Sequence, residues 1–285
     1  MNDKFDISEN VTIEKERVMK KTVNMRLINT FRVLKYRSGE TEPYDIKETH
    51  NALTSTGKDR FLQLGVNQST DHLTSSTDLR IYNSSNTLVK TLTSCDSGWP
   101  KTSNEAGVAL KNVVWQWTDS STDTYEANRL DVVSPGAVVF SQGTLGFGTK
   151  ATNEQWVYEY TVSISSADSD FVDEGLDSWL RMLVGYNGDH WDAGKTFCRI
   201  YNGVSIVQTE TPSSGPTVNT GSDKVSWVFT FSDGQANGDW GAYTMKIESN
   251  LFLDGNVDLR DGSTGTTGVK GSGDTWTLTY EFSVN

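Results

Sequence analysis

The feature that most constrains this chain is an internal duplication, in which two segments of about 115 residues carry the same motifs in the same order. Residues 80–83 (RIYN) recur as residues 199–202, with a spacing of 119. Four positions near the end of the first segment recur in the second with a spacing of 120, namely Gly148, Lys150, Trp156 and Tyr160, which match Gly268, Lys270, Trp276 and Tyr280. A repeat of this length predicts two units with one shared fold.

Within each repeat the hydrophobic pattern is that of β-strands. Residues 156–162 (WVYEYTV) and 276–284 (WTLTYEFSV) alternate apolar and polar side chains, which is typical of half-buried strands. Clusters of Gly, Ser, Asn, Asp and Thr separate such segments at the short intervals expected of hairpins. The sequence therefore predicts an all-β protein of two tandem β-sandwich modules, resembling jelly rolls.

One short helix is expected at the start of each module. Residues 57–64 (GKDRFLQL) align with residues 175–182 (GLDSWLRM), and apolar side chains recur at helical spacing in both. The candidate N-caps are Ser55 or Thr56 in the first helix and Asp173 in the second, and the candidate stop signals are Gly65 and Gly185.

These elements divide the chain into three parts. Residues 1–53 are predicted to be an N-terminal arm followed by a β-hairpin, residues 54–166 the first β-sandwich module, and residues 167–285 the second. The polar segment 165–170 between the modules has no long flexible tract, so the modules are expected to dock closely.

Composition excludes several classes of partner. A formal charge of −12 and a pI near 4.7 argue against nucleic-acid binding, which needs clustered Lys and Arg. No apolar run reaches the roughly 18 to 20 residues of a membrane span, and the first residues lack the apolar core of a signal peptide. We therefore expect a soluble protein made in the cytoplasm, with no membrane or nucleic-acid partner and with Cys95 and Cys198 as free thiols.

No motif for catalysis, metal binding or cofactor binding is present. The three histidines, His50, His72 and His190, are far apart, and no serine lies in a GxSxG motif. The stretch from Gly143 to Lys150 approaches a phosphate-binding loop, but its lysine is one place late and Ala151 supplies no hydroxyl. Because Lys270 repeats this lysine, a structural role beside a turn is the simpler explanation. We predict no enzyme activity, no metal and no cofactor.

Three groups of acidic residues suggest alternative functions. Asp168, Asp170, Asp173 and Glu174, and separately residues 254–258 (DGNVD), offer oxygen ligands for calcium, but solvated acidic loops, with Asp173 as a helix cap, are the preferred explanation. Glu159 and Glu281 suggest the carboxylate pair of a glycosidase. Both are expected to lie on the face of their strand opposite the aromatic side chains, and so to point to solvent.

The repeat separates five of the nine tryptophans into two groups. Trp156 and Trp276 occupy matched positions, so shared packing in a core explains them best. Trp99, Trp191 and Trp240 have no counterpart in the other repeat, and they are the candidates for exposed contact residues.

Short motifs connect this chain to a known class of proteins. Residues 31–36 (FRVLKY), a turn, residues 50–57 (HNALTSTG) and the Gly-x-Lys turns before the aromatic strands resemble a pattern found in virion proteins of tailed bacteriophages. The resemblance implies a non-enzymatic structural component of a phage particle, either a capsid decoration protein or part of the neck or tail.

The expected function is therefore assembly into a virion after synthesis in the host cytoplasm. The arm, the strand edges and the loops would contact capsid, neck or tail proteins, and the chain would form a homo-oligomer. A trimer would present six similar modules, which suits a six-fold surface. The alternatives are a carbohydrate- or receptor-binding module on the virion surface, using the three unmatched tryptophans, and a glycan-active enzyme.

Overall fold

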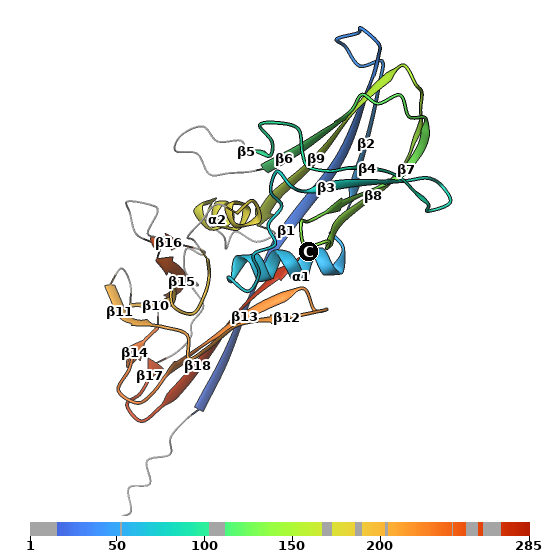
Figure 1. Ribbon diagram of the computed structural model, residues 1–285. Helices are drawn as coiled ribbons and strands as arrows, with labels where there is room; N and C mark the ends of the chain where they lie inside the picture. The colour runs from blue at the N-terminus through green and yellow to red at the C-terminus, as the bar shows by residue number, and fades with distance from the viewer. Residues whose placement is uncertain are drawn as a thin grey trace, which may run out of the picture.

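The described part of the chain is mostly β, as the hydrophobic pattern predicted. The computed structural model describes residues 16–51, 53–102, 112–166, 173–185, 190–202, 205–240, 242–248, 256–258 and 269–285. Within these ranges lie one eight-stranded sheet, two four-stranded sheets, one two-stranded sheet and two helices (Figure 1). The all-β fold class is confirmed.

Strand β1 (Glu16–Arg37) is the central element of the eight-stranded sheet. Its first half pairs in parallel with β18 (Thr275–Val284), and its second half pairs antiparallel with β9 (Glu154–Ser166). After a turn, β2 (Asp45–Asn51) returns antiparallel along the second half of β1. The predicted hairpin is present, but its first strand begins at Glu16, so residues 16–25 belong to the sheet rather than to an arm.

The order of strands is the same on both sides of β1. The sheet runs β12-β13-β18-β1-β9-β6-β5, so β18, β13 and β12 on one side correspond to β9, β6 and β5 on the other. The outer strands have the bounds β5 (Lys101–Thr102), β6 (Asn112–Asp119), β12 (Ser214–Asn219) and β13 (Lys224–Phe231). This correspondence supports the repeat, although the sheet is continuous through both halves.

Two smaller sheets also correspond to each other, in the orders β4-β3-β7-β8 and β11-β10-β15-β16, and a two-stranded sheet joins β14 and β17. The repeated RIYN segments lie in β3 and β10. The bounds are β3 (Asp78–Tyr82), β4 (Leu88–Leu92), β7 (Tyr125–Val133), β8 (Val139–Lys150), β10 (Thr196–Asn202), β11 (Ser205–Glu210), β14 (Gly238–Asp239), β15 (Ala242–Glu248), β16 (Asn256–Asp258) and β17 (Val269–Lys270). The division into two tandem modules remains a prediction that this matched order supports.

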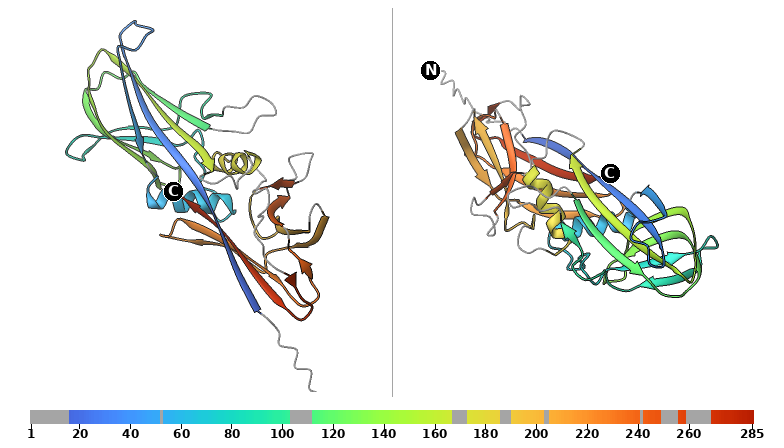
Figure 2. Two further views of the ribbon diagram at one scale, coloured as in Figure 1. Left: turned by 180° about the vertical axis from the view of Figure 1, so that it is seen from behind. Right: turned by 90° about the horizontal axis from the view of Figure 1, so that it is seen from above.

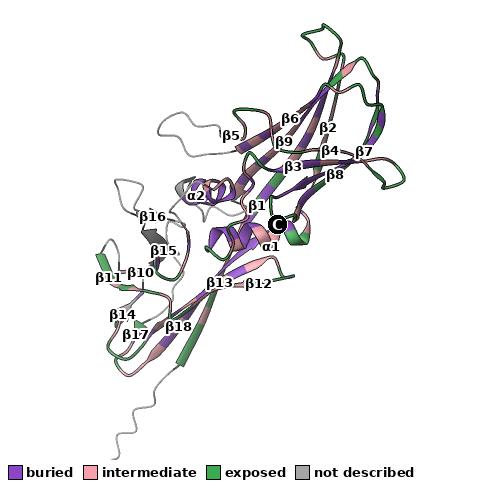
Figure 3. Cartoon of the chain, in the orientation of Figure 1, coloured by how far each residue is buried: buried purple, intermediate pink, exposed green. Residues whose placement is uncertain are grey.

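One face of the large sheet is covered, and the other is more open, although Leu34, Val157 and Glu281 on that second face are buried. Odd-numbered residues of β1, such as Val23, Met25 and Leu27, are buried, whereas Val18 and Ile28 on the other face are exposed. Because side chains alternate along a strand, the same face is buried through both halves of β1. The burial pattern in Figure 3 and the further views in Figure 2 show the smaller sheets and the helices gathered against the large sheet.

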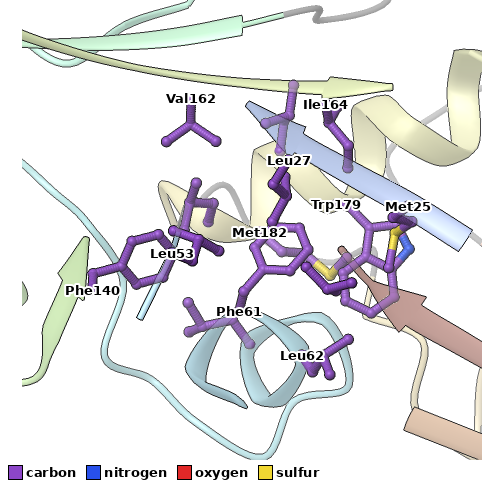
Figure 4. Packing of buried hydrophobic residues seen from close by; sticks show 14 of the residues in the cluster. Met25, Leu27, Leu53, Phe61, Leu62, Phe140, Val162, Ile164, Trp179 and Met182 are labelled. Atoms are coloured by element: carbon purple, nitrogen blue, oxygen red, sulfur yellow. The ribbon is translucent and has the colours of Figure 1, made fainter. Parts of the chain in front are cut away.

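The two helices pack against each other near the middle of the molecule. The rings of Phe61 in α1 (Ser55–Gly65) and Trp179 in α2 (Asp173–Leu183) stack with centroids 5.4 Å apart. Figure 4 shows both side chains, with Met182, pointing into the same cluster as Met25 and Leu27 of β1. The two positions that the repeat aligned therefore meet in the core.

The ends of the helices agree only in part with the ends predicted from the sequence. The N-cap of α1 is Thr54, whose Oγ1 accepts a hydrogen bond from the Gly57 N–H at 2.8 Å, so the prediction of Ser55 or Thr56 is wrong by one or two residues. Gly185 has φ +78 and follows α2, in agreement with its predicted role. The side chain of Asp173 lies outside the described residues.

Candidate assembly interface along strand β1

β1 presents equivalent surfaces to the two halves of the chain. Lys35 faces Trp156, and its Nζ lies 4.7 Å from the centroid of that ring. Arg17 faces the matched Trp276, and its guanidinium carbon lies 4.8 Å from the centroid. Lys35 and Arg17 lie at equal distances from Arg26 along the sequence of β1, in opposite directions. β1 therefore makes a similar cation–π contact with each half of the chain.

The lysine that recurs in the two repeats, Lys150 in the first and Lys270 in the second, is buried and holds a turn in both halves. Lys150 Nζ donates to the Ser121 carbonyl at 2.6 Å, and Lys270 Nζ donates to the Ser232 carbonyl at 3.0 Å. Both lysines are at most 1 % exposed. Each therefore ties the end of β8 or β17 to the turn after β6 or β13, which is the structural role that the repeat predicted.

The backbone hydrogen bonds of β1 define which residues face which edge. The Met25 carbonyl accepts from the Asn285 N–H at 2.9 Å, and the Leu27 N–H donates to the Asn285 carbonyl at 3.2 Å. Odd-numbered residues of β1 thus turn their backbone N–H and C=O groups toward β18. Because these groups alternate along a strand, even-numbered residues turn theirs toward the opposite edge.

Among the strands that the structure describes, one pairs with that opposite edge only along the second half of β1. The register with β9 begins at Met25. Among the described strands, none pairs with residues 16–22 on this edge. Figure 1 and the left view of Figure 2 both show the end of β1 near Glu16 with β18 on one side only. We call residues 16–22 on this side the free edge of β1.

The side chains beside the free edge are exposed and of mixed character. Val18 is 77 % exposed, the highest value among the large apolar side chains that the structure describes. Glu16 and Lys20 flank it on the same face and are also exposed. An unpaired strand edge beside exposed side chains is a place where another strand can add to a sheet.

The two glutamates considered for glycoside hydrolysis are engaged in ion pairs. Glu159 Oε2 lies 3.4 Å from Arg32, and the Glu281 oxygens lie 2.8 Å from Lys20 and from Lys224. Burial acts to raise the pKa of Glu281, but the hydrogen bonds from the two lysines outweigh it and lower the pKa. Glu281 is only 6 % exposed, so the expectation of a solvent-facing side chain is wrong for it, because both lysines lie over it from neighbouring strands.

A surface cleft of about 510 Å³ lies at the middle of β1, where the end of β18 approaches the end of β2. Asn29 is buried there, with its Oδ1 accepting from the Tyr160 hydroxyl at 2.7 Å, and its Nδ2 has no partner among the described groups. The rim includes Arg26 and His50. The cleft is open and mixes polar with apolar residues.

Two of the three tryptophans expected as exposed contacts are in the core. Trp191 and Trp240 are 0 % and 1 % exposed, so that prediction is wrong for both. Trp191 Nε1 donates to Ser178 Oγ at 3.1 Å, and the Trp240 ring lies 4.9 Å from that of Trp276. Trp99 is partly exposed, and Lys101 Nζ lies 4.2 Å from its ring centroid.

The histidines and cysteines make separate contacts. The Nδ1 atoms of His50, His72 and His190 lie 2.6–3.0 Å from Thr30 Oγ1, the Met182 carbonyl and the Leu64 carbonyl respectively. Both cysteines are free thiols, and burial raises the pKa of each. Across the described ranges, no three His, Cys, Asp or Glu side chains gather as metal ligands. The candidate calcium ligands at 168–174 and 254–258 lie outside the described side chains.

Neither α1 nor α2, the helices found in the described ranges, has the length and apolar character to cross a bilayer.

The free edge is not predicted from the sequence, because the charges of Arg17, Lys20 and Lys21 indicate a solvated tail. A usable signal was present. Met19, Val23, Met25 and Leu27 continue a period of two along odd-numbered positions, which predicts a strand that begins well before Arg26.

Comparison with protein-family models, with curated proteins and with solved structures finds no match to this chain.

Proposed function

We propose that this chain is a non-enzymatic structural component of a tailed-phage particle, which contacts capsid, neck or tail proteins through strand edges and loops. The motifs that resemble phage virion proteins support the class of particle. The observation that supports the mode of action is the free edge of β1, where the backbone groups of the even-numbered residues from 16 to 22 point away from β18 and face no described strand. A strand edge of this kind binds a partner by extending the sheet.

The contacts of the reactive side chains also favour a binding role. Glu159 and Glu281 are paired with cations, and the two cysteines are held as thiols by burial. The lysine of the near phosphate loop, Lys150, is buried against a backbone carbonyl. The two glutamates and the lysine thus have structural partners that account for their presence, and the two thiols are accounted for by burial.

The alternative is that the chain is a carbohydrate- or receptor-binding module, and one observation supports this alternative. Trp99 is partly exposed and lies under Lys101, an arrangement in which a ring could stack on a sugar. Replacing Trp99 with Ala should abolish binding to a glycan array if this alternative holds. Trp240→Phe, which changes a core ring, serves as the control for unspecific effects of losing an indole.

The proposed function is tested by locating the chain in particles. Virions from the source culture are purified by density gradient, and the chain is quantified against the major capsid protein by mass spectrometry. We expect a fixed ratio, and antibody labelling in electron micrographs should mark one position on the particle. A chain that stays in the soluble fraction while particles are complete would contradict the proposal.

A further inference from the structure

We infer that two copies of this chain pair through the free edge of β1, antiparallel to each other and related by a two-fold axis at Val18. The pairing would join the two large sheets into one. The inference rests on the proposed function for the role of this edge in assembly, and it deepens that function by naming the first partner as a second copy of the chain.

The backbone of β1 is arranged for such a contact. Even-numbered residues from Glu16 to Thr22 turn their N–H and C=O groups toward the free edge, since the odd-numbered ones turn toward β18. A two-fold axis perpendicular to the sheet keeps the open face of each copy on the same side, so even-numbered residues meet even-numbered residues. The hydrogen-bonding groups then face each other in register.

Several registers bring even-numbered residues opposite even-numbered residues, and the side chains favour one of them. With the axis at Val18, the two Val18 side chains meet, and Glu16 of each copy lies opposite Lys20 of the other. An axis at Arg17, Lys20 or Lys21 would place like charges directly opposite each other. An axis at Met19 would set Arg17 against Lys21. Opposite charges stabilise a cross-strand pair and like charges destabilise it, so over residues 16–20, the described residues that face one another in this register, the axis at Val18 is favoured.

The side chains at this register are available for the contact. The Val18 side chain is largely exposed, and a self-pairing strand would cover it. Lys20 keeps 56 % of its side chain exposed even though its Nζ lies 2.8 Å from Glu281, so it can also reach a carboxylate on a neighbouring strand. The pairing would therefore extend an existing ion-pair cluster rather than disrupt one.

The other half of β1 provides an internal precedent. There, both edges are occupied, because β9 lies on one side and β2 on the other over residues 29–35. Counted outward from Arg26, the corresponding residues of the first half are 17–23, and they have β18 on one side only among the described strands. The second half thus shows that β1 accepts a further strand at this place in the sheet.

A proline at Val18 tests the backbone contact directly. Val18→Pro removes the one N–H that points to the free edge at the axis and leaves the bonds to β18 intact, because those come from odd-numbered residues. We expect wild-type protein to sediment as a dimer at about 100 µM, and Val18→Pro to sediment as a monomer with an unchanged circular dichroism spectrum. Ile28→Thr, which alters an exposed apolar residue on the same open face, should remain a dimer.

Charge variants test the register. Glu16→Lys should weaken the dimer about tenfold, since it sets Lys against Lys20 in two symmetry-related pairs. In a Lys20→Glu background, the same Glu16→Lys change should instead strengthen the dimer. The contact between Lys20 and Glu281 cannot cause this reversal of sign, because the Lys20→Glu protein lacks that contact both with and without the Glu16→Lys change.

Each other outcome contradicts the inference. A wild-type monomer or trimer, or a Glu16→Lys effect of the same sign in both backgrounds, overturns the two-fold pairing at Val18. If residues 1–15 covered the edge within one chain, Val18→Pro would change stability without changing the sedimenting mass. A dimer that never enters particles refutes the proposed function alone, and a particle component that is monomeric refutes this inference alone.

Discussion

Replacing Lys150 with Met is the sharpest test of how the repeated lysine stabilises the fold. The side chain is fully buried, and its Nζ donates to the Ser121 carbonyl at 2.6 Å and lies 4.0 Å from the Asp119 carboxylate. Met preserves the length of the side chain, so the change removes a charge and a donor with little change in volume. It leaves a partly buried carbonyl and a buried carboxylate with one fewer partner.

The size of the effect follows from those two groups. An unsatisfied buried carbonyl costs about 1–3 kcal/mol, and removing one partner from a buried ion pair costs about 3–5 kcal/mol. Asp119 keeps its hydrogen bonds from the Tyr125 hydroxyl and the Ser121 N–H, and Lys90 lies 4.0 Å away. We therefore expect Lys150→Met to lower the free energy of unfolding by about 3 kcal/mol.

Lys270 supplies a matched control in the other half. Its Nζ donates to the Ser232 carbonyl at 3.0 Å and to Asn237 Oδ1 at 3.1 Å, and both acceptors are neutral. Lys270→Met should therefore cost about 1.5 kcal/mol, less than Lys150→Met. Urea denaturation followed by tryptophan fluorescence measures both variants at neutral pH. A cost below about 0.5 kcal/mol for Lys150→Met, or a larger cost for Lys270→Met, would refute the reasoning.

The difference between the two variants should depend on pH. Burial acts to raise the pKa of Asp119, but hydrogen bonds from Tyr125 and Ser121 and the charge of Lys150 outweigh it and lower the pKa. The stability that comes from a depressed pKa is present above about pH 4 and is lost as the pH falls through the pKa of the folded state. The cost of Lys150→Met should accordingly shrink in acid, and one that grew there would contradict this assignment.

Two further substitutions test the packing and the ion pairs. Gly65→Ala should destabilise the fold by about 1–3 kcal/mol, because its Cβ would lie 1.8 Å from the Trp179 ring, whereas Gly146→Ala, with open space around it, should change the melting temperature little. Glu281→Gln should lower stability at neutral pH and have less effect in acid, since the pKa of Glu281 is lowered by its two lysines; a pH-independent loss in urea titrations would contradict that account.

The repeat made part of the core predictable from the sequence. Trp156 and Trp276 are buried at matched positions, and Lys150 and Lys270 fill matched turns, because residues that recur in two copies record the packing that both copies share. The converse inference failed. Trp191 and Trp240 have no repeated counterpart, yet they are core residues. The second half packs them against Phe282 and Phe231, so lack of a counterpart reflects local divergence of packing rather than exposure.

The role of β1 could not be read from local pattern because it depends on partners distant in sequence. The periodicity predicts that a strand passes through residues 19–27. It does not specify that this strand pairs with β18 in one half and with β9 in the other. The free edge follows only from that pairing, and a hydrophobic pattern carries no information on which of the two strand edges is occupied.

The pairing of β1 with β18 also determines when the chain can finish folding on the ribosome. β1 is translated before every other described strand and β18 after all of them, yet they are neighbours. Until β18 emerges, the first half of β1 has neither edge covered by a described strand. Such long-range pairing slows folding and exposes strand edges to association with other chains. Nascent chains that stop short of β18 should therefore be the species most prone to aggregate and most in need of a chaperone.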